Sequence, residues 1–132
     1  MEQKRTESEK LTLNLGYVDL GRIDLMVSEG FYANRSDFIR TAIRNQITSH
    51  NTTVEQSVSR NTMDLGVREF DKDYLDQTVA AGQMLNVKVV GLVRITDNVS
   101  PELALTAFES IEVLGALQAT PAVKKALAGR IR

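Results

Sequence analysis

Two patterns of hydrophobic periodicity follow one another near the N-terminus and predict a strand–helix–helix unit with very short connections. Residues 10–15, KLTLNL, alternate polar and apolar side chains, as a half-buried strand does. With Asp19 as N-cap, apolar residues then recur at helical spacing until Gly30, where a glycine typically ends a helix. Asn34 opens a second helix, with Asp37 at the reciprocal position of a capping box. A unit of under ~50 residues has too little core to fold alone.

The second helix carries an apolar stripe that is wider than one packing partner needs. The stripe consists of Phe38, Ile39, Ala42, Ile43 and Ile47. We expect this helix to be buried on two sides and the single strand before it to pair with another strand. A second copy of the chain meets both needs, because the strands can pair antiparallel while the helices interlock. The sequence therefore predicts a homodimer through residues 10–48.

The outer face of such a two-stranded ribbon would carry Lys10, Thr12 and Asn14. A two-stranded ribbon fits the major groove of B-DNA, and all three residue types can bond base edges. The alternative is that these residues form only the solvated face of a strand. The unit is short and needs a second copy to fold, which favours binding to double-stranded DNA over a strand face that is only solvated.

A phosphate site is expected where the second helix begins, at Asn34, Arg35 and Ser36. The first backbone N–H groups of a helix have no acceptor within the helix, and its N-terminal end carries positive dipole charge. Lys4 and Arg5 are further candidates for contacts with the DNA backbone.

These segments resemble the ribbon-helix-helix superfamily, of the CopG, Arc and MetJ kind. The resemblance covers residues 10–48, and the stretch NRSDFIR is similar to the nickel-responsive repressor branch. It implies base reading by the outward strand residues and phosphate anchoring at the start of the second helix, in repressors or antitoxins. The nickel branch binds its metal through His and Cys in the C-terminal region. Residues 63–132 contain neither, so nickel sensing is not implied and no cofactor is expected.

A weak internal repeat marks residues 63–132. Gly66, Gly91 and Gly115 recur at nearly equal spacing, each inside an apolar, β-prone stretch that is followed by a helical one. Repeated β-loop-α units predict a short β-α solenoid with parallel strands. An ordinary two-layer α/β sandwich is the alternative. Because nothing in the sequence shields the outer strands, we expect this region to form higher oligomers.

The expected fold class is α+β, in four parts. These are a polar, disordered arm at 1–9, a ribbon-helix-helix domain at 10–48, a segment at 49–62 that is a linker or a fraying helix extension, and an α/β domain at 63–132 that oligomerises or receives a signal.

Composition excludes several classes of protein. The 132 residues include no cysteine and one histidine, so disulfide frameworks, thiol catalysis and multi-histidine metal sites are excluded. No apolar run approaches the roughly 18 residues of a membrane span, and the polar stretch MEQKRTESEK lacks the apolar region of a signal peptide. A cytoplasmic, nucleoid-associated protein without a membrane partner is expected. Asp71, Asp73 and Asp76 lack the other residues of a calcium loop, which favours helix capping. No constellation of residues indicates an enzyme.

The leading hypothesis is a bacterial-type transcriptional regulator, a repressor that reads operator DNA through a homodimer. An antitoxin or adaptor with a protein-binding C-terminal domain is one alternative. An architectural protein that coats DNA is another, although the net charge of −1 provides no general basic field.

Overall fold

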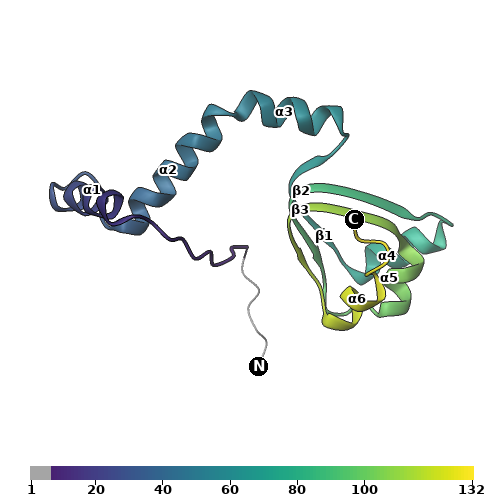
Figure 1. Cartoon of the computed structure of the whole chain (residues 1–132). Coiled ribbons are helices and arrows are strands. Elements are labelled where there is room, and N and C mark those ends of the chain that lie inside the picture. The colour runs from purple at the N-terminus through teal and green to yellow at the C-terminus, as the bar shows by residue number, and fades with distance from the viewer. Residues whose placement is uncertain (1–6) are drawn as a thin grey trace. The chain divides into compact units, whose positions relative to one another are not determined.

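The computed structural model describes residues 7–132, and the chain divides into two compact units between Glu55 and Gln56. Lys4 and Arg5 lie outside the described residues. The helices before the sheet are α1 (Tyr17–Ser28), α2 (Arg35–Ser49) and α3 (Asn51–Arg60) (Figure 1).

Helix α1 begins earlier than the sequence predicts. Its N-cap is Gly16, which has no side chain to bond the first turn, so the prediction that Asp19 is the cap is wrong. Asp19 lies inside the first turn, where its charge is favourable to the helix dipole. The predicted C-terminal end is confirmed: Gly30 has a φ of +84°, and the Phe31 amide donates to the Met26 carbonyl at 3.0 Å.

The predicted cap of α2 is confirmed. The Asn34 Oδ1 accepts from the Asp37 amide at 2.8 Å, and the Asp37 Oδ2 accepts from the Ala33 amide at 2.9 Å. These reciprocal bonds satisfy backbone donors that the helix itself leaves without acceptors. The start of α2 is therefore determined by local sequence.

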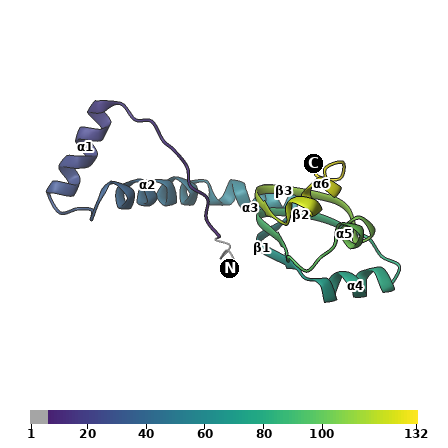
Figure 2. The same ribbon diagram turned by 90° about the horizontal axis from the view of Figure 1, so that it is seen from below.

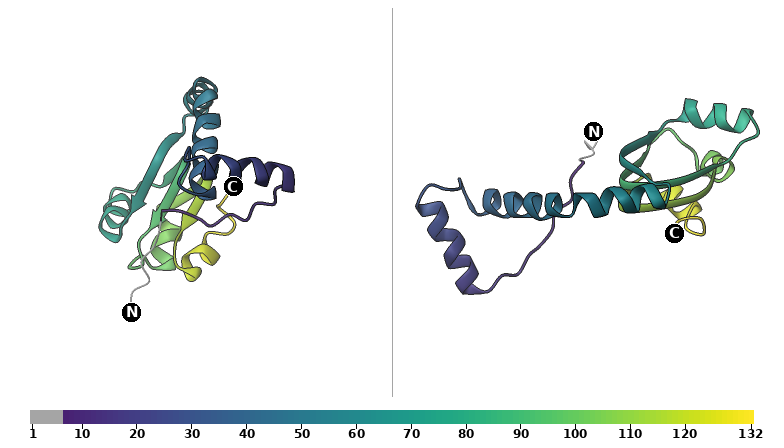
Figure 3. Two further views of the ribbon diagram at one scale, coloured as in Figure 1. Left: turned by 90° about the vertical axis from the view of Figure 1, so that its left-hand side faces the viewer. Right: turned by 90° about the horizontal axis from the view of Figure 1, so that it is seen from above.

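Residues 10–15, expected as a strand, form no regular secondary structure; they run as an extended segment into α1 (Figure 3, purple). The prediction of a strand is wrong for the single chain, because a strand needs a hydrogen-bonding neighbour. The described part of the chain places no strand beside this segment. Leu11 and Leu13 remain 81% and 60% exposed.

Residues 49–62 contain helix α3, which agrees with the alternative of a helix extension through this segment. Val54 and Val58 are spaced by one helical turn, and the Asn51 side chain donates to the Glu55 carboxylate at 3.1 Å. The boundary between the two units falls inside this helix.

The second unit alternates strands and helices. Its elements are β1 (Asp64–Phe70), α4 (Lys72–Ala80), β2 (Leu85–Ile95), α5 (Pro101–Ala107), β3 (Phe108–Gln118) and α6 (Pro121–Ala126). The strands form one parallel sheet in the order β1-β2-β3, and α4, α5 and α6 lie side by side along it (Figures 1 and 2). The predicted succession of β-α units with parallel strands is present. The sheet and its helices also form two layers, so the fold has features of both the β-α solenoid and the two-layer α/β sandwich that the sequence left open.

The three repeat glycines form one row across the sheet. Gly66 pairs with Gly91, and Gly91 with Gly115. All three have positive φ, between +127° and +137°, which side chains disfavour. A Cβ on Gly91 would lie 2.1 Å from the Gly66 carbonyl oxygen. The spacing in the sequence therefore reflects a close backbone approach that only glycine permits.

The core lies between the sheet and its helices. Val89 and Val93 of β2, Leu75 of α4, Ala104 of α5 and Val123 of α6 are all fully buried in one cluster. Each helix thus covers the same face of the sheet.

The expectation that nothing shields the outer strands is wrong for β3. The Ile111 amide donates to the Arg130 carbonyl at 2.9 Å, and the Arg132 amide donates to the Ile111 carbonyl at 2.8 Å. The C-terminal residues therefore cover part of this edge. Strand β1 is the other edge of the sheet.

Candidate nucleic-acid interface

The first unit leaves most of its apolar residues in contact with solvent. Ile23 is the one apolar residue that is fully buried in the described part of this unit. Leu11, Leu13, Ile43 and Ile47 are each at least half exposed. An isolated soluble protein rarely exposes so much contiguous apolar surface. This side of the unit has the character of an interface.

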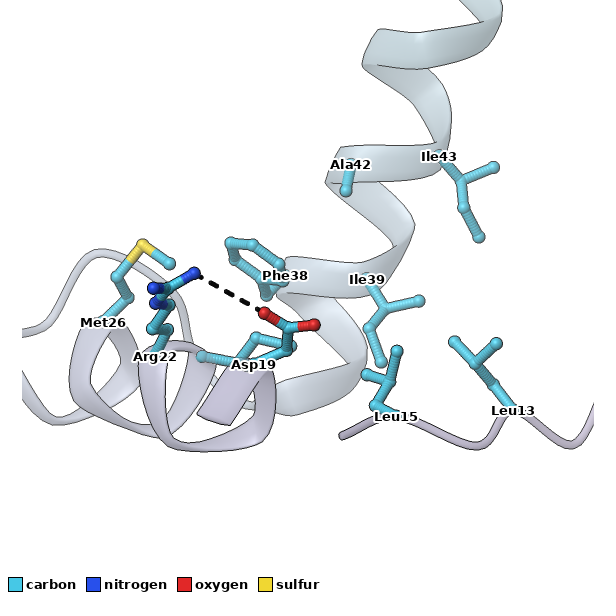
Figure 4. A pocket seen from close by; sticks show the side chains of 10 residues that line it. Leu13, Leu15, Asp19, Arg22, Met26, Phe38, Ile39, Ala42 and Ile43 are labelled. Carbon is cyan, nitrogen blue, oxygen red and sulfur yellow. Dashed lines mark ion pairs between the residues drawn. The ribbon is translucent and has the colours of Figure 1, made fainter. Parts of the chain in front are cut away.

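A groove of about 500 Å³ runs along this apolar side (Figure 4). Leu13 and Leu15 of the extended segment point toward Ile39 and Ile43 of α2 across it. Its other lining residues are Asp19, Arg22, Ile23, Met26, Phe38 and Ala42. The residues of the predicted stripe, except Ile47, therefore line one surface, but within the single chain that surface is open.

A second groove, of about 380 Å³, brings two of the predicted DNA-contacting groups to one place. Thr12 of the extended segment and Ser36 of α2 both line it, next to Ile39 and Arg40. The predicted base-reading segment thus lies near the predicted phosphate site at the start of α2. The sequence favours a solvated helix face over a phosphate contact for Arg40, but the structure places Arg40 along the same groove.

Lys10, Thr12 and Asn14 are all exposed. They alternate with the leucines of the same extended segment, as a two-sided ribbon requires. The structure therefore leaves these side chains accessible to a ligand.

Arg35 has a partner that the sequence did not predict. Its Nε and Nη2 donate to Oδ1 and Oδ2 of Asp24, each at 2.8 Å. The hydrogen bond to Arg35 lowers the pKa of Asp24, and the same bond raises the pKa of Arg35. The two residues lie on different helices, so no local pattern could reveal the pair. A phosphate that binds Arg35 has to compete with, or share, this carboxylate.

The acidic cluster in the second unit has structural roles. Asp71 caps α4 by accepting from the Tyr74 amide at 2.8 Å, and Asp76 accepts from the Lys72 Nζ at 3.0 Å. The prediction of helix capping is confirmed for Asp71. No group of three or more potential metal ligands occurs in residues 7–132. Among these residues, no helix is long and apolar enough to cross a membrane.

Comparison with protein families shows which family the chain resembles. A model described as the ribbon-helix-helix transcriptional regulator family matches residues 6–124, which include most of both units. No curated protein and no solved structure matches the chain.

Proposed function

Because the chain belongs to the ribbon-helix-helix transcriptional regulator family, we propose that this DNA-binding regulator acts as a homodimeric repressor. In the proposed dimer, residues 10–15 of the two copies pair antiparallel and form a ribbon in the major groove. The operator is read in the cytoplasm, at the nucleoid.

The open apolar side of the first unit carries this proposal. Leu11 and Leu13, on the extended segment, and Ile43 and Ile47, on α2, are exposed in one copy. A second copy that paired with the segment would cover these residues and give the segment the ladder partner it lacks. Burial of such side chains stabilises by roughly 1.5–3 kcal/mol each, which explains how a small unit could fold as a dimer.

Base recognition is assigned to Lys10, Thr12 and Asn14. Lysine can donate to guanine, asparagine can bond adenine at two points, and threonine can contact the thymine methyl group. Their exposure and their alternation with the leucines support this assignment.

Phosphate binding is assigned to the start of α2. The Arg35 and Ser36 amides lie in the first helical turn, where the helix offers no acceptor. The Asn34 side chain is used by the cap, so its contribution is to hold these amides in position. Lys4 and Arg5 are proposed as additional backbone contacts.

The second unit is proposed to join copies of the chain into a higher oligomer. Strand β1 is an edge of the sheet, and the second units of different copies would hydrogen-bond to one another through this strand. Linked dimers bind neighbouring half-sites at high effective concentration, which would offset the absence of a general basic field. A chain without residues 63–132 should still prefer the correct half-site but bind the full operator weakly and without cooperativity.

Selection of DNA fragments by the purified protein, at stated salt, followed by their sequencing, tests the central proposal. Enrichment of a common motif with two-fold symmetry is expected. Equal binding of specific and random DNA in a filter assay would favour an architectural role instead. Copurification of a toxin-like protein would favour the antitoxin alternative, although the folded core of the second unit differs from the disordered tails that wrap toxins.

A further inference from the structure

The sheet of the second unit has one face that its helices do not cover. Val89 and Val93 point into the core, so alternation along β2 places Val90 and Leu92 on the opposite face. We call this the outer face, and its apolar residues are Leu65, Val67, Val90, Leu92, Leu114 and Ala116. They form two adjacent rows across the sheet, Leu65–Val90–Leu114 and Val67–Leu92–Ala116.

The outer face is apolar in its centre and exposed along its two outer strands. Leu65, Val67 and Leu114 are 61%, 53% and 61% exposed, whereas Leu92 on the middle strand is only 6% exposed. Parallel sheets are normally covered on both faces, because their strands are apolar on both sides. An open parallel sheet with this composition therefore indicates that a further layer is missing on this face.

The charged residues at the ends of the outer face are balanced within the chain. Arg94 donates to Glu69 at 3.3 Å and to Gln118 at 3.2 Å. At the other end Lys88 stands opposite Glu112 in the strand register. A covering layer can therefore approach without leaving an unbalanced charge under it.

The size of the outer face determines what can cover it. Three strands over about seven residues present a flat area of roughly 300 Å². A free partner protein needs about 800 Å² on each side for a stable complex. A surface this small forms a lasting contact only if its partner is already held nearby, where the effective concentration reaches the millimolar range.

We propose that the outer face packs against the outer face of the second copy within the same homodimer. This inference rests on the proposed dimerisation through the first unit, which supplies the tether. The two sheets then form a four-layer arrangement of helices, sheet, sheet and helices, related by a two-fold axis. We place the two-fold axis through the middle of the outer face, so that the middle strand β2 crosses its counterpart and Val90 lies near Val90 of the second copy.

The chain contains no cysteine, so Val90→Cys introduces a single thiol per copy. Facing sheets lie about 10 Å apart, which a bis-maleimide of similar length can span. The full-length Val90→Cys protein should give a covalent dimer at least about tenfold faster than a Leu105→Cys control, because the tether raises the local concentration. Leu105 is 36% exposed on α5, on the helical side of the sheet.

A second variant separates the contact from random collision. Leu114→Glu, added to Val90→Cys, should reduce cross-linking to the control rate, while circular dichroism shows that the exposed substitution leaves the fold intact. Sedimentation of the same samples distinguishes the possible failures. A dimer that cross-links no faster at Val90 than at Leu105 would overturn the outer-face contact and leave the proposed function standing. A monomer at tens of micromolar would overturn the homodimer itself.

Discussion

Arg35 and Asp24 form a two-point ion pair between α2 and α1, with both N–O distances at 2.8 Å. In the free chain, the guanidinium of Arg35, a residue of the proposed phosphate site, is therefore held by an internal carboxylate. The pair is exposed, so water and salt screen it and a phosphate can displace it at modest cost.

Removal of the competing carboxylate should strengthen DNA binding. We expect Asp24→Asn to raise affinity for specific and random DNA alike, because Arg35 then meets phosphate without competition. Arg35→Ala should lower both affinities and reduce the slope of log affinity against log salt by about one unit. Fluorescence anisotropy at several salt concentrations measures both effects.

Glu29→Gln is the control for Asp24→Asn. Glu29 is an exposed carboxylate at the C-cap of α1, and it lies outside both grooves. Both variants change net charge equally. If the two variants bind DNA with the same affinity, release of Arg35 is not the cause.

Substitution of the outward strand residues should change specificity rather than stability. We expect Asn14→Ala to reduce discrimination between operator and random DNA by about 1–3 kcal/mol, the usual value of a base-edge contact. Lys10→Ala should act in the same way. The melting temperature should be nearly unchanged, because both side chains are exposed. Retention of full sequence preference in both variants would show that another surface reads the bases.

Ile43 should contribute far more to stability than its exposure in one chain implies. It is 50% exposed in the single copy, but we expect the second copy to bury it. Ile43→Ala should then destabilise the dimer by about 2–5 kcal/mol for each copy. Urea unfolding at several protein concentrations measures this loss. Val18→Ala on α1 is the control, since Val18 is 71% exposed and lies outside both grooves. Equal, small effects of the two substitutions would contradict burial of Ile43.

The glycine row offers a comparison at matched backbone geometry. Gly66 and Gly91 have φ values of +131° and +137°, but a Cβ has open space at Gly66 and meets a backbone oxygen at Gly91. Gly66→Ala should cost only the backbone strain, about 1–3 kcal/mol. Gly91→Ala should add a clash that the sheet cannot relieve without separating β1 from β2. Hydrogen exchange in β2 should show a much larger loss of protection for Gly91→Ala, and equal losses would disprove the close approach.

Features that depend on residues close together in the chain were predictable. The cap formed by Asn34 and Asp37 and the glycine end of α1 arise within a few residues, so local pattern identifies them. The start of α1 was predicted wrongly for a reason that is also local. Gly16 has no side chain that would mark it as an N-cap, whereas Asp19 has a side chain typical of one.

The sequence by itself determined the order and period of the elements. The alternation at 10–15, the apolar stripe of α2 and the regular spacing of Gly66, Gly91 and Gly115 follow from which side chains must face a core and where the backbones must approach. Only the tertiary structure decided which distant groups meet. It joined Arg35 to Asp24, placed the C-terminal residues beside Ile111, and left residues 10–15 without a strand partner. These outcomes depend on contacts between segments far apart, or on a second chain, and no local preference encodes such contacts.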